Sequence, residues 1–273
     1  MADDEMTIAL AQMPVARGEV RTNIEVASRC VREAAERGAE LVLLPELWST
    51  GYDLARSSAY AHITRTEVLP AMSALARALG VFIAGSVLLD DGDERVFNSG
   101  LVIGPSGTTV GRYDKLHLFG LMEEDRYLTP GGEMAMASLA ACDAGLAICY
   151  DLRFPELFLA YALAGASLIL LPAEWPAVRH EHWRTLVRAR AIENAYYVAA
   201  CNCAGTSGPT LFGGHSILVD PWGKVVLEGG AGDELLIGTI ALERVHAARS
   251  TMPALADRRP DVYAPSLHAM SVP

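Results

Sequence analysis

Segments with the hydrophobic pattern of strands alternate along this chain with segments that have helical periodicity. Short apolar runs have the length and composition of strands, and between them apolar residues recur every three or four positions, as on one face of a helix. The predicted strands cover residues 6–13, 41–44, 81–86, 96–103, 108–113, 144–149, 167–171, 197–200, 215–219 and 224–227. The predicted helices cover residues 20–37, 67–79, 155–164 and 181–194. This order predicts an α/β fold with mixed sheets, and it leaves open whether there is one sheet or two.

Chain length and composition indicate a folded globular protein. The chain has 273 residues, of which 51% are hydrophobic and 20% charged, a balance that supports a sizeable core. There is no break in composition and no Gly-, Ser- or Pro-rich linker. We therefore predict a single domain over residues 1–273.

Charge and cysteine content restrict the partners and the compartment. The net charge is -11, which argues against nucleic acid or an anionic membrane surface as a partner. No apolar stretch reaches the roughly 18 residues that span a bilayer. The acidic start, residues 1–5, lacks the features of a secretory signal. The five cysteines are an odd number without a CxxC pair, so we expect free thiols in a reducing cytoplasm.

Three predicted strand ends carry side chains that together suit acyl transfer. Glu46 follows the run 41–45, Lys115 follows the strand 108–113, and Cys149 ends the run 144–148. A free thiol has a pKa of about 8.5 and needs a base, which Glu46 could supply. Lys115 would stabilise the thiolate and then the oxyanion of a tetrahedral intermediate, with the backbone N–H of Tyr150 as a second donor.

Other interpretations of these residues have to be weighed. A buried cysteine is usually a small core residue, and we expect this of Cys30, Cys142, Cys201 and Cys203. A Cys–His thiol protease could pair Cys149 with His117 or His215, but it would leave Glu46 and Lys115 without roles. The run His180-Glu181-His182 does not have the HExxH spacing of a zinc protease, so we predict no metal site. Neither a Walker-type phosphate loop nor a GxSxG elbow is present.

Three motifs in order resemble the nitrilase superfamily of carbon–nitrogen hydrolases. They are LLPELWSTGYD around Glu46, GRYDKLHLFG around Lys115 and ICYDLRFPEL around Cys149. Further matches begin at Pro172 (PAEWP), His182 (HWRTLVRARAIEN), Gly213 (GGHSILVDPWGKV) and Asp257 (DRRPDVY). The resemblance implies a Glu46–Lys115–Cys149 triad that needs no cofactor. It also implies a four-layer αββα sandwich with two mixed sheets, and a homodimer or larger homo-oligomer.

The family often carries a second glutamate shortly before a Leu-x-Pro-Gly turn. Here the turn is residues 128–131, and the spacing favours Glu124. The adjacent Glu123 is the alternative, and an exposed acidic loop would give neither residue a role.

The compact chain is similar to the Nit-like omega-amidase branch, which hydrolyses monoamides of dicarboxylic acids such as 2-oxoglutaramate. Deaminated glutathione amidases, aliphatic amidases and N-carbamoyl amino acid hydrolases remain alternatives, and a catalytically silent scaffold is a more remote one. A dicarboxylic substrate needs a cation for its far carboxylate, and Arg179 is the candidate. Tyr52 and Trp175 are candidates for the pocket lining, whereas Arg153 could be structural.

Overall fold

Two six-stranded mixed sheets form the centre of the computed structural model, which describes residues 5–93 and 95–263. The first has the order β14-β1-β2-β3-β4-β5, with β1 (Glu5–Gln12), β2 (Leu41–Leu43), β3 (Phe82–Asp90), β4 (Val96–Ile103), β5 (Thr109–Asp114) and β14 (Glu234–Ala241). The second has the order β13-β12-β9-β8-β7-β6, with β6 (Met136–Ser138), β7 (Asp143–Leu146), β8 (Leu168–Ala173), β9 (Tyr197–Asn202), β12 (Ile217–Val219) and β13 (Val225–Glu228). A separate hairpin consists of β10 (Ala204–Ser207) and β11 (Thr210–Gly213).

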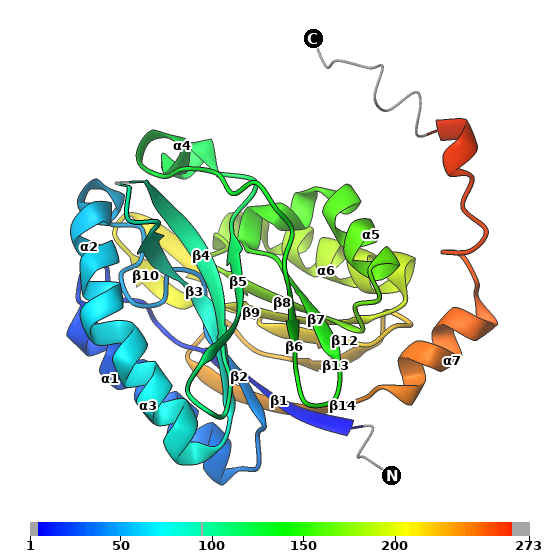
Figure 1. Ribbon diagram of the computed structural model, residues 1–273, viewed down its shortest axis with the longest axis horizontal. Coiled ribbons are helices and arrows are strands. Elements are labelled where there is room, and N and C mark those ends of the chain that lie inside the picture. Colours follow the sequence, from blue (N-terminus) through cyan, green and yellow to red (C-terminus); the bar gives the residue numbers. More distant parts are fainter. Residues whose placement is uncertain (1–4, 94, 264–273) are drawn as a thin grey trace.

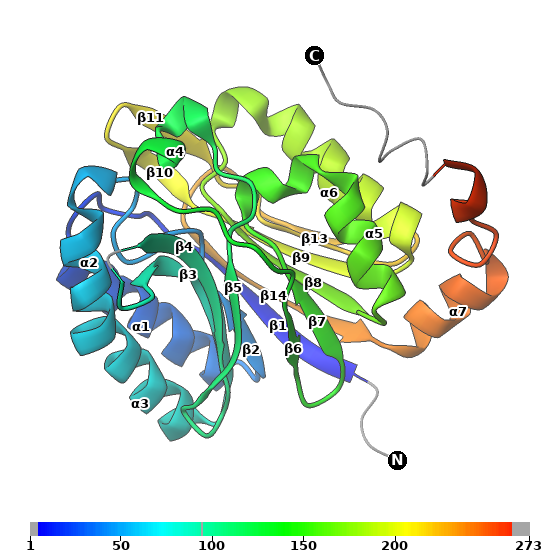
Figure 2. The ribbon, with the colours of Figure 1, turned by 45° about the horizontal axis from the view of Figure 1, so that its top comes forward.

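Helices cover the outer face of each sheet (Figures 1 and 2). α1 (Val20–Glu36), α2 (Ser57–Ile63) and α3 (Leu69–Leu79) lie on the first sheet, and α5 (Pro155–Leu163) and α6 (His180–Asn194) lie on the second. The short α4 (Glu124–Tyr127) lies at the same end of the molecule as β10 and β11, and α7 (Glu243–Thr251) lies beyond the second sheet.

The period of two in a strand explains how one sheet has two buried faces. Along β1, Ile8 and Leu10 belong to the apolar cluster shared with the second sheet, whereas Ala9 and Ala11 pack with the cluster under α1 and α3. The sheets therefore pack face to face between two helical layers. This confirms the predicted α/β class and the four-layer αββα sandwich.

The predicted elements differ from the observed ones at specific places. The strand expected at 144–149 ends at Leu146. It does not include Cys149, whose φ of 43° lies outside the β region. The helix expected at 67–79 is α3 preceded by a π-helical turn, Thr64–Val68, and by α2. The short β6, the β10–β11 hairpin, α4, β14 and α7 were not predicted.

Strand direction brings the three candidate catalytic residues to one end of the structure. β1, β2 and β3 are parallel, and β5 runs in the same direction as β3 because each is antiparallel to β4. Glu46 and Lys115 therefore leave the first sheet at the same end. β7, β8 and β9 are parallel in the second sheet, so Cys149 and Glu174 also follow strand ends that lie together.

Within the described residues, we find no helix that is both long and apolar enough to cross a membrane. Residues 1–4, most of the acidic start that argued against a secretory signal, lie outside the described part of the chain.

Candidate active site

Lys115 lies at the centre of a buried group of charged side chains. Its Nζ is 2.6 Å from Oε1 of Glu46 and 2.7 Å from Oε2 of Glu124, and all three side chains are fully buried. Asn98, a polar residue in the fully buried β4, donates from Nδ2 to Glu46 at 2.8 Å and to Glu124 at 3.0 Å. The amide and the ammonium together fix the two carboxylates relative to each other.

A turn after α4 places Glu124, and not Glu123, beside Lys115. The N–H of Gly131 donates to the carbonyl of Lys115 at 2.9 Å, and a Cβ at Gly131 would collide with the carbonyl oxygen of Asp114. The 128–131 turn therefore packs directly on the end of β5. Glu123 points to solvent and pairs with Arg126 at 3.0 Å.

Cys149 opens a 3-10 turn, Cys149–Arg153, in the left-handed backbone region. Asp151 holds this turn: its carboxylate accepts the N–H of Ile148 at 2.8 Å, the Tyr113 hydroxyl at 2.7 Å and the N–H of His117 at 3.1 Å. The N–H of Tyr150 belongs to the first residues of the turn, where helical N–H groups lack intrahelical acceptors.

Burial and the charges of Glu46 and Glu124 together set the protonation of Cys149 and Lys115. Burial raises the pKa of the Cys149 thiol well above its usual range, and the Glu46 carboxylate adds to this through its charge and a hydrogen bond to the thiol. Burial alone would lower the pKa of Lys115, but the Glu124 and Glu46 carboxylates outweigh it and raise that pKa. The resting site is therefore a thiol beside an ammonium. A base must take the thiol proton as the sulfur attacks.

A small cavity opens from Cys149 and has two arginines in its wall. Its lining consists of Phe119, Cys149, Tyr150, Arg153, Glu174, Trp175, Pro176 and Arg179. The Arg179 guanidinium lies 5.7 Å from the Phe119 ring centre, and the Arg153 guanidinium lies 4.8 Å from that of Trp175. The Trp175 Nε1 donates to the Arg179 carbonyl at 2.9 Å, which ties these two wall residues together.

Tyr52 lies beside the buried charged group. It is not among the residues that line this cavity, and its hydroxyl donates to Oε1 of Glu124 at 3.3 Å. Tyr52 thus contacts the charged group around Lys115 instead of the cavity wall.

One group of side chains has the donor types of a metal site. Ring nitrogens of His180 and His215 and a carboxylate oxygen of Glu228 all lie within 4.8 Å of one another. The Arg184 Nε already donates to both oxygens of Glu228 at 3.0 Å, which neutralises that carboxylate. His182 belongs to the run whose spacing argued against a zinc site, and it is not part of this group: its Nδ1 lies 3.4 Å from a guanidinium nitrogen of Arg153.

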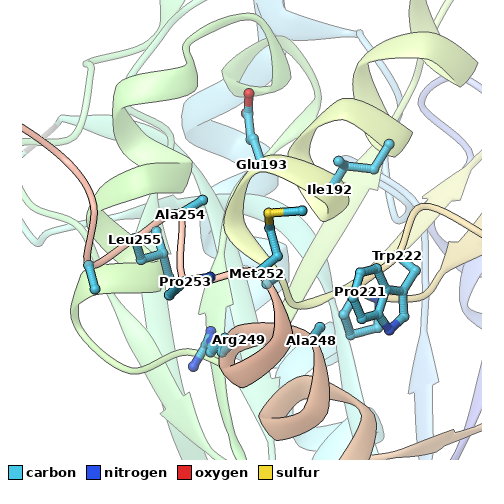
Figure 3. Close-up of a pocket in the computed structure, with 12 residues that line it drawn as sticks. Ile192, Glu193, Pro221, Trp222, Ala248, Arg249, Met252, Pro253, Ala254 and Leu255 are labelled. Atoms are coloured by element: carbon cyan, nitrogen blue, oxygen red, sulfur yellow. The ribbon is translucent and has the colours of Figure 1, made fainter.

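A wider apolar groove lies elsewhere, between α6, α7 and the β12–β13 turn (Figure 3). Ile192, Trp222 and Met252 line it, and none of the residues around Cys149 does. The reactive group therefore lies in the smaller cavity.

Sequence analysis missed several residues of this site, although signals for them existed. Glu174 follows an apolar strand just as Glu46 does, and Asn98 interrupts an apolar strand with a buried amide. Asp151 lies inside the motif around Cys149. At each position a polar side chain lies next to apolar residues in the sequence, which indicates a buried polar group.

Comparison with known proteins identifies the class. The sequence model of the carbon-nitrogen hydrolase family matches residues 7–250. The chain is therefore a hydrolase that acts on carbon–nitrogen bonds other than peptide bonds. It belongs to the carbon-nitrogen hydrolase family, which confirms the resemblance to the nitrilase superfamily.

Individual relatives match over nearly their whole length. A 2-oxoglutaramate amidase of Bacillus subtilis (strain 168) is 37% identical over 258 residues, 94% of this chain and 99% of that protein. The omega-amidase NIT2 of Mus musculus is 32% identical over 265 residues, 94% of this chain and 96% of that protein. The crystal structure of a carbon-nitrogen hydrolase from Helicobacter pylori G27 has a TM-score of 0.90 at 25% identity, covering 97% of this chain and 98% of the other.

Proposed function

We propose that this chain hydrolyses the terminal amide of a small dicarboxylic monoamide such as 2-oxoglutaramate. The reaction would release ammonia and a carboxylic acid through a thioester on Cys149. The observation that carries this proposal is the buried Lys115 ammonium held between Glu46 and Glu124, at the strand ends next to Cys149. A thiol, a base and an oxyanion-stabilising cation are the groups that amide cleavage requires.

In the acylation half-reaction, the Cys149 sulfur attacks the amide carbon while Glu46 takes the thiol proton. The amide oxygen becomes an oxyanion that the Lys115 ammonium and the Tyr150 N–H stabilise. When the carbon–nitrogen bond breaks, Glu46 returns the proton to the departing nitrogen, and ammonia leaves. The acyl group remains on sulfur as a thioester.

In the deacylation half-reaction, Glu46 takes a proton from a water molecule that attacks the thioester. The same two donors stabilise the new tetrahedral intermediate. When its carbon–sulfur bond breaks, Glu46 gives the proton to the Cys149 sulfur, which restores the thiol, and the carboxylic acid leaves. Glu124 keeps Lys115 in place through both steps, since its two oxygens lie 2.9 and 2.7 Å from Nζ.

Two lines of support favour a dicarboxylic monoamide. Relatives at 37% and 32% identity are named 2-oxoglutaramate amidase and omega-amidase. In addition, Arg153 and Arg179 put two positive charges in the wall of the cavity at Cys149, in a protein whose net charge is -11. A guanidinium there suits the far carboxylate of such a substrate.

Ammonia release from 2-oxoglutaramate tests the proposal, with Cys149→Ala purified in parallel. We expect release by the wild type that the variant lacks. Release from deaminated glutathione, N-carbamoyl amino acids or aliphatic amides alone would reject the omega-amidase assignment and keep the hydrolase class. A wild type inactive on the entire panel would favour a silent scaffold.

The Arg179→Ala variant should distinguish substrates by charge. Loss of a charge-assisted hydrogen bond should reduce kcat/KM for 2-oxoglutaramate about 10- to 100-fold. A neutral amide such as butyramide should change only a few-fold. Arg184→Ala, an arginine paired with Glu228 away from the cavity lining, is the matched control. Equal losses on both substrates would remove Arg179 from carboxylate recognition.

We also propose a cytoplasmic homodimer or larger homo-oligomer in which residues 1–273 form one domain. Its supports are the family resemblance, the five free cysteines and the match over residues 7–250. Light scattering coupled to size-exclusion chromatography measures the assembly directly.

A further inference from the structure

Glu174 is a buried carboxyl group that the proposed mechanism does not use. It follows β8 directly, is 1% exposed and lines the cavity at Cys149. Neither carboxyl oxygen has a hydrogen-bond partner among the residues that the structure describes. A buried carboxyl without a donor is costly, so a ligand that brings donors would compensate for it.

The neighbouring carboxylates, unlike Glu174, have hydrogen-bond partners. Glu46 and Glu124 both accept hydrogen bonds from Lys115 and Asn98. Burial raises the pKa of Glu174 well above its usual range, and the nearby Glu46 carboxylate raises it further. A neutral carboxyl group can still accept an N–H through its carbonyl oxygen.

One contact indicates which part of the substrate would face Glu174. The backbone N–H of Glu174 donates to Oε2 of Glu46 at 3.0 Å, so Glu174 lies on the Glu46 side of the site. The departing nitrogen must approach Glu46, because Glu46 returns the proton to it. The oxyanion has to lie toward Lys115 and the Tyr150 N–H. The nitrogen of a primary amide, with two N–H donors, therefore comes within reach of the unpartnered oxygens.

We propose that the Glu174 carboxyl group accepts a hydrogen bond from the –NH2 group of the substrate and holds that nitrogen until it leaves as ammonia. This rests on the proposed amide hydrolysis. It makes Glu174 a specificity residue for primary amides: an ester of the same acid has no N–H to donate. Both substrates form the same thioester, so they share the deacylation step.

Succinamate and monomethyl succinate are a matched pair for the test. In Glu174→Ala, kcat/KM for succinamate should fall about 10- to 100-fold, while that for the ester stays within about threefold. Glu174→Gln keeps one acceptor oxygen and should recover part of the amide activity. Glu156→Ala, a glutamate exposed on α5, controls for a change of surface charge and should leave both rates unchanged.

Binding measured without turnover gives a second readout. In a Cys149→Ala background, Glu174→Ala should weaken calorimetric binding of succinamate and leave that of monomethyl succinate unchanged. Thermal unfolding shows whether each variant is folded. Equal losses on amide and ester, or an unchanged amide rate, would overturn the role of Glu174 alone. A wild type that cleaves the ester but no amide would overturn the proposed function as well.

Discussion

Replacing Cys149 with serine should reduce ammonia release about 10³-fold or more, with the fold intact. The two side chains have nearly the same shape, and the φ of 43° at this position favours neither cysteine nor serine. The two residues differ in how readily the side chain loses its proton. Burial already raises the pKa of the thiol, and Glu46 must remove its proton during attack. A hydroxyl is far harder to deprotonate and a weaker nucleophile in the same place.

Initial rates of ammonia release and intact-protein mass spectrometry after acid quenching measure this effect. The wild type should gain the mass of the acyl group, and Cys149→Ala should not. Cys30→Ser, on the outer helix α1, is the matched control and should keep full activity. A Cys149→Ser enzyme within about tenfold of the wild type would contradict a mechanism that depends on thiol chemistry.

The sequence made the candidate residues visible because Glu46 and Cys149 follow apolar runs and Lys115 follows a predicted strand. Lys115 comes directly after β5, as the pattern indicated, and parallel strand ends then gather the side chains. The family motifs added the order Glu46, Lys115, Cys149. Their catalytic roles are predictions that the Cys149→Ser and Lys115→Met variants test.

Long-range pairing could not be predicted from local pattern. β14 pairs with β1, which lies more than 200 residues earlier in the chain, and the local pattern of hydrophobic residues cannot indicate this pairing. The positive φ of Cys149 likewise depends on the Asp151 contacts with Tyr113 and His117, which come from another strand end. Tertiary hydrogen bonds of this kind set the geometry of the reactive turn.

The structure distinguishes the two adjacent candidates for the second glutamate, Glu123 and Glu124. Sequence spacing favoured Glu124, and the two side chains have opposite environments in the structure: Glu124 is fully buried against Lys115, while Glu123 is exposed beside Arg126. The Gly131 contact with the end of β5 fixes this register.

Lys115→Met should abolish activity and lower the free energy of unfolding by about 3–5 kcal/mol at neutral pH, because it removes one partner of a buried ionic group. Methionine fills a similar volume, so the cost comes from the carboxyl groups of Glu46 and Glu124, which lose their common ammonium. Lys115 and Lys224 are the only lysines among the 22 Lys and Arg residues of the chain, and Lys224 is exposed. Lys224→Met is therefore the matched control.

The loss of stability should also depend on pH, and the direction follows from the carboxyl groups. Burial above all raises the pKa of Glu124, and loss of the ammonium would raise it further. Below about pH 4.3 the carboxyl is protonated in the unfolded chain as well, so its raised pKa does not change the free energy of unfolding. As pH rises from there toward the pKa of the folded state, the free energy of unfolding falls. The pKa of Lys115 is raised, so its own contribution in the wild type persists between pH 5 and 8.

Urea denaturation at pH 5 and pH 8 tests this sign. The difference in unfolding free energy between wild type and Lys115→Met should be larger at pH 8, while Lys224→Met should follow the wild type at both values. A difference that is the same at both pH values would mean that Glu124 does not gain a proton when the ammonium is removed. A difference larger at pH 5 would contradict the assignment of Lys115 as the cation that favours the ionised form of Glu124.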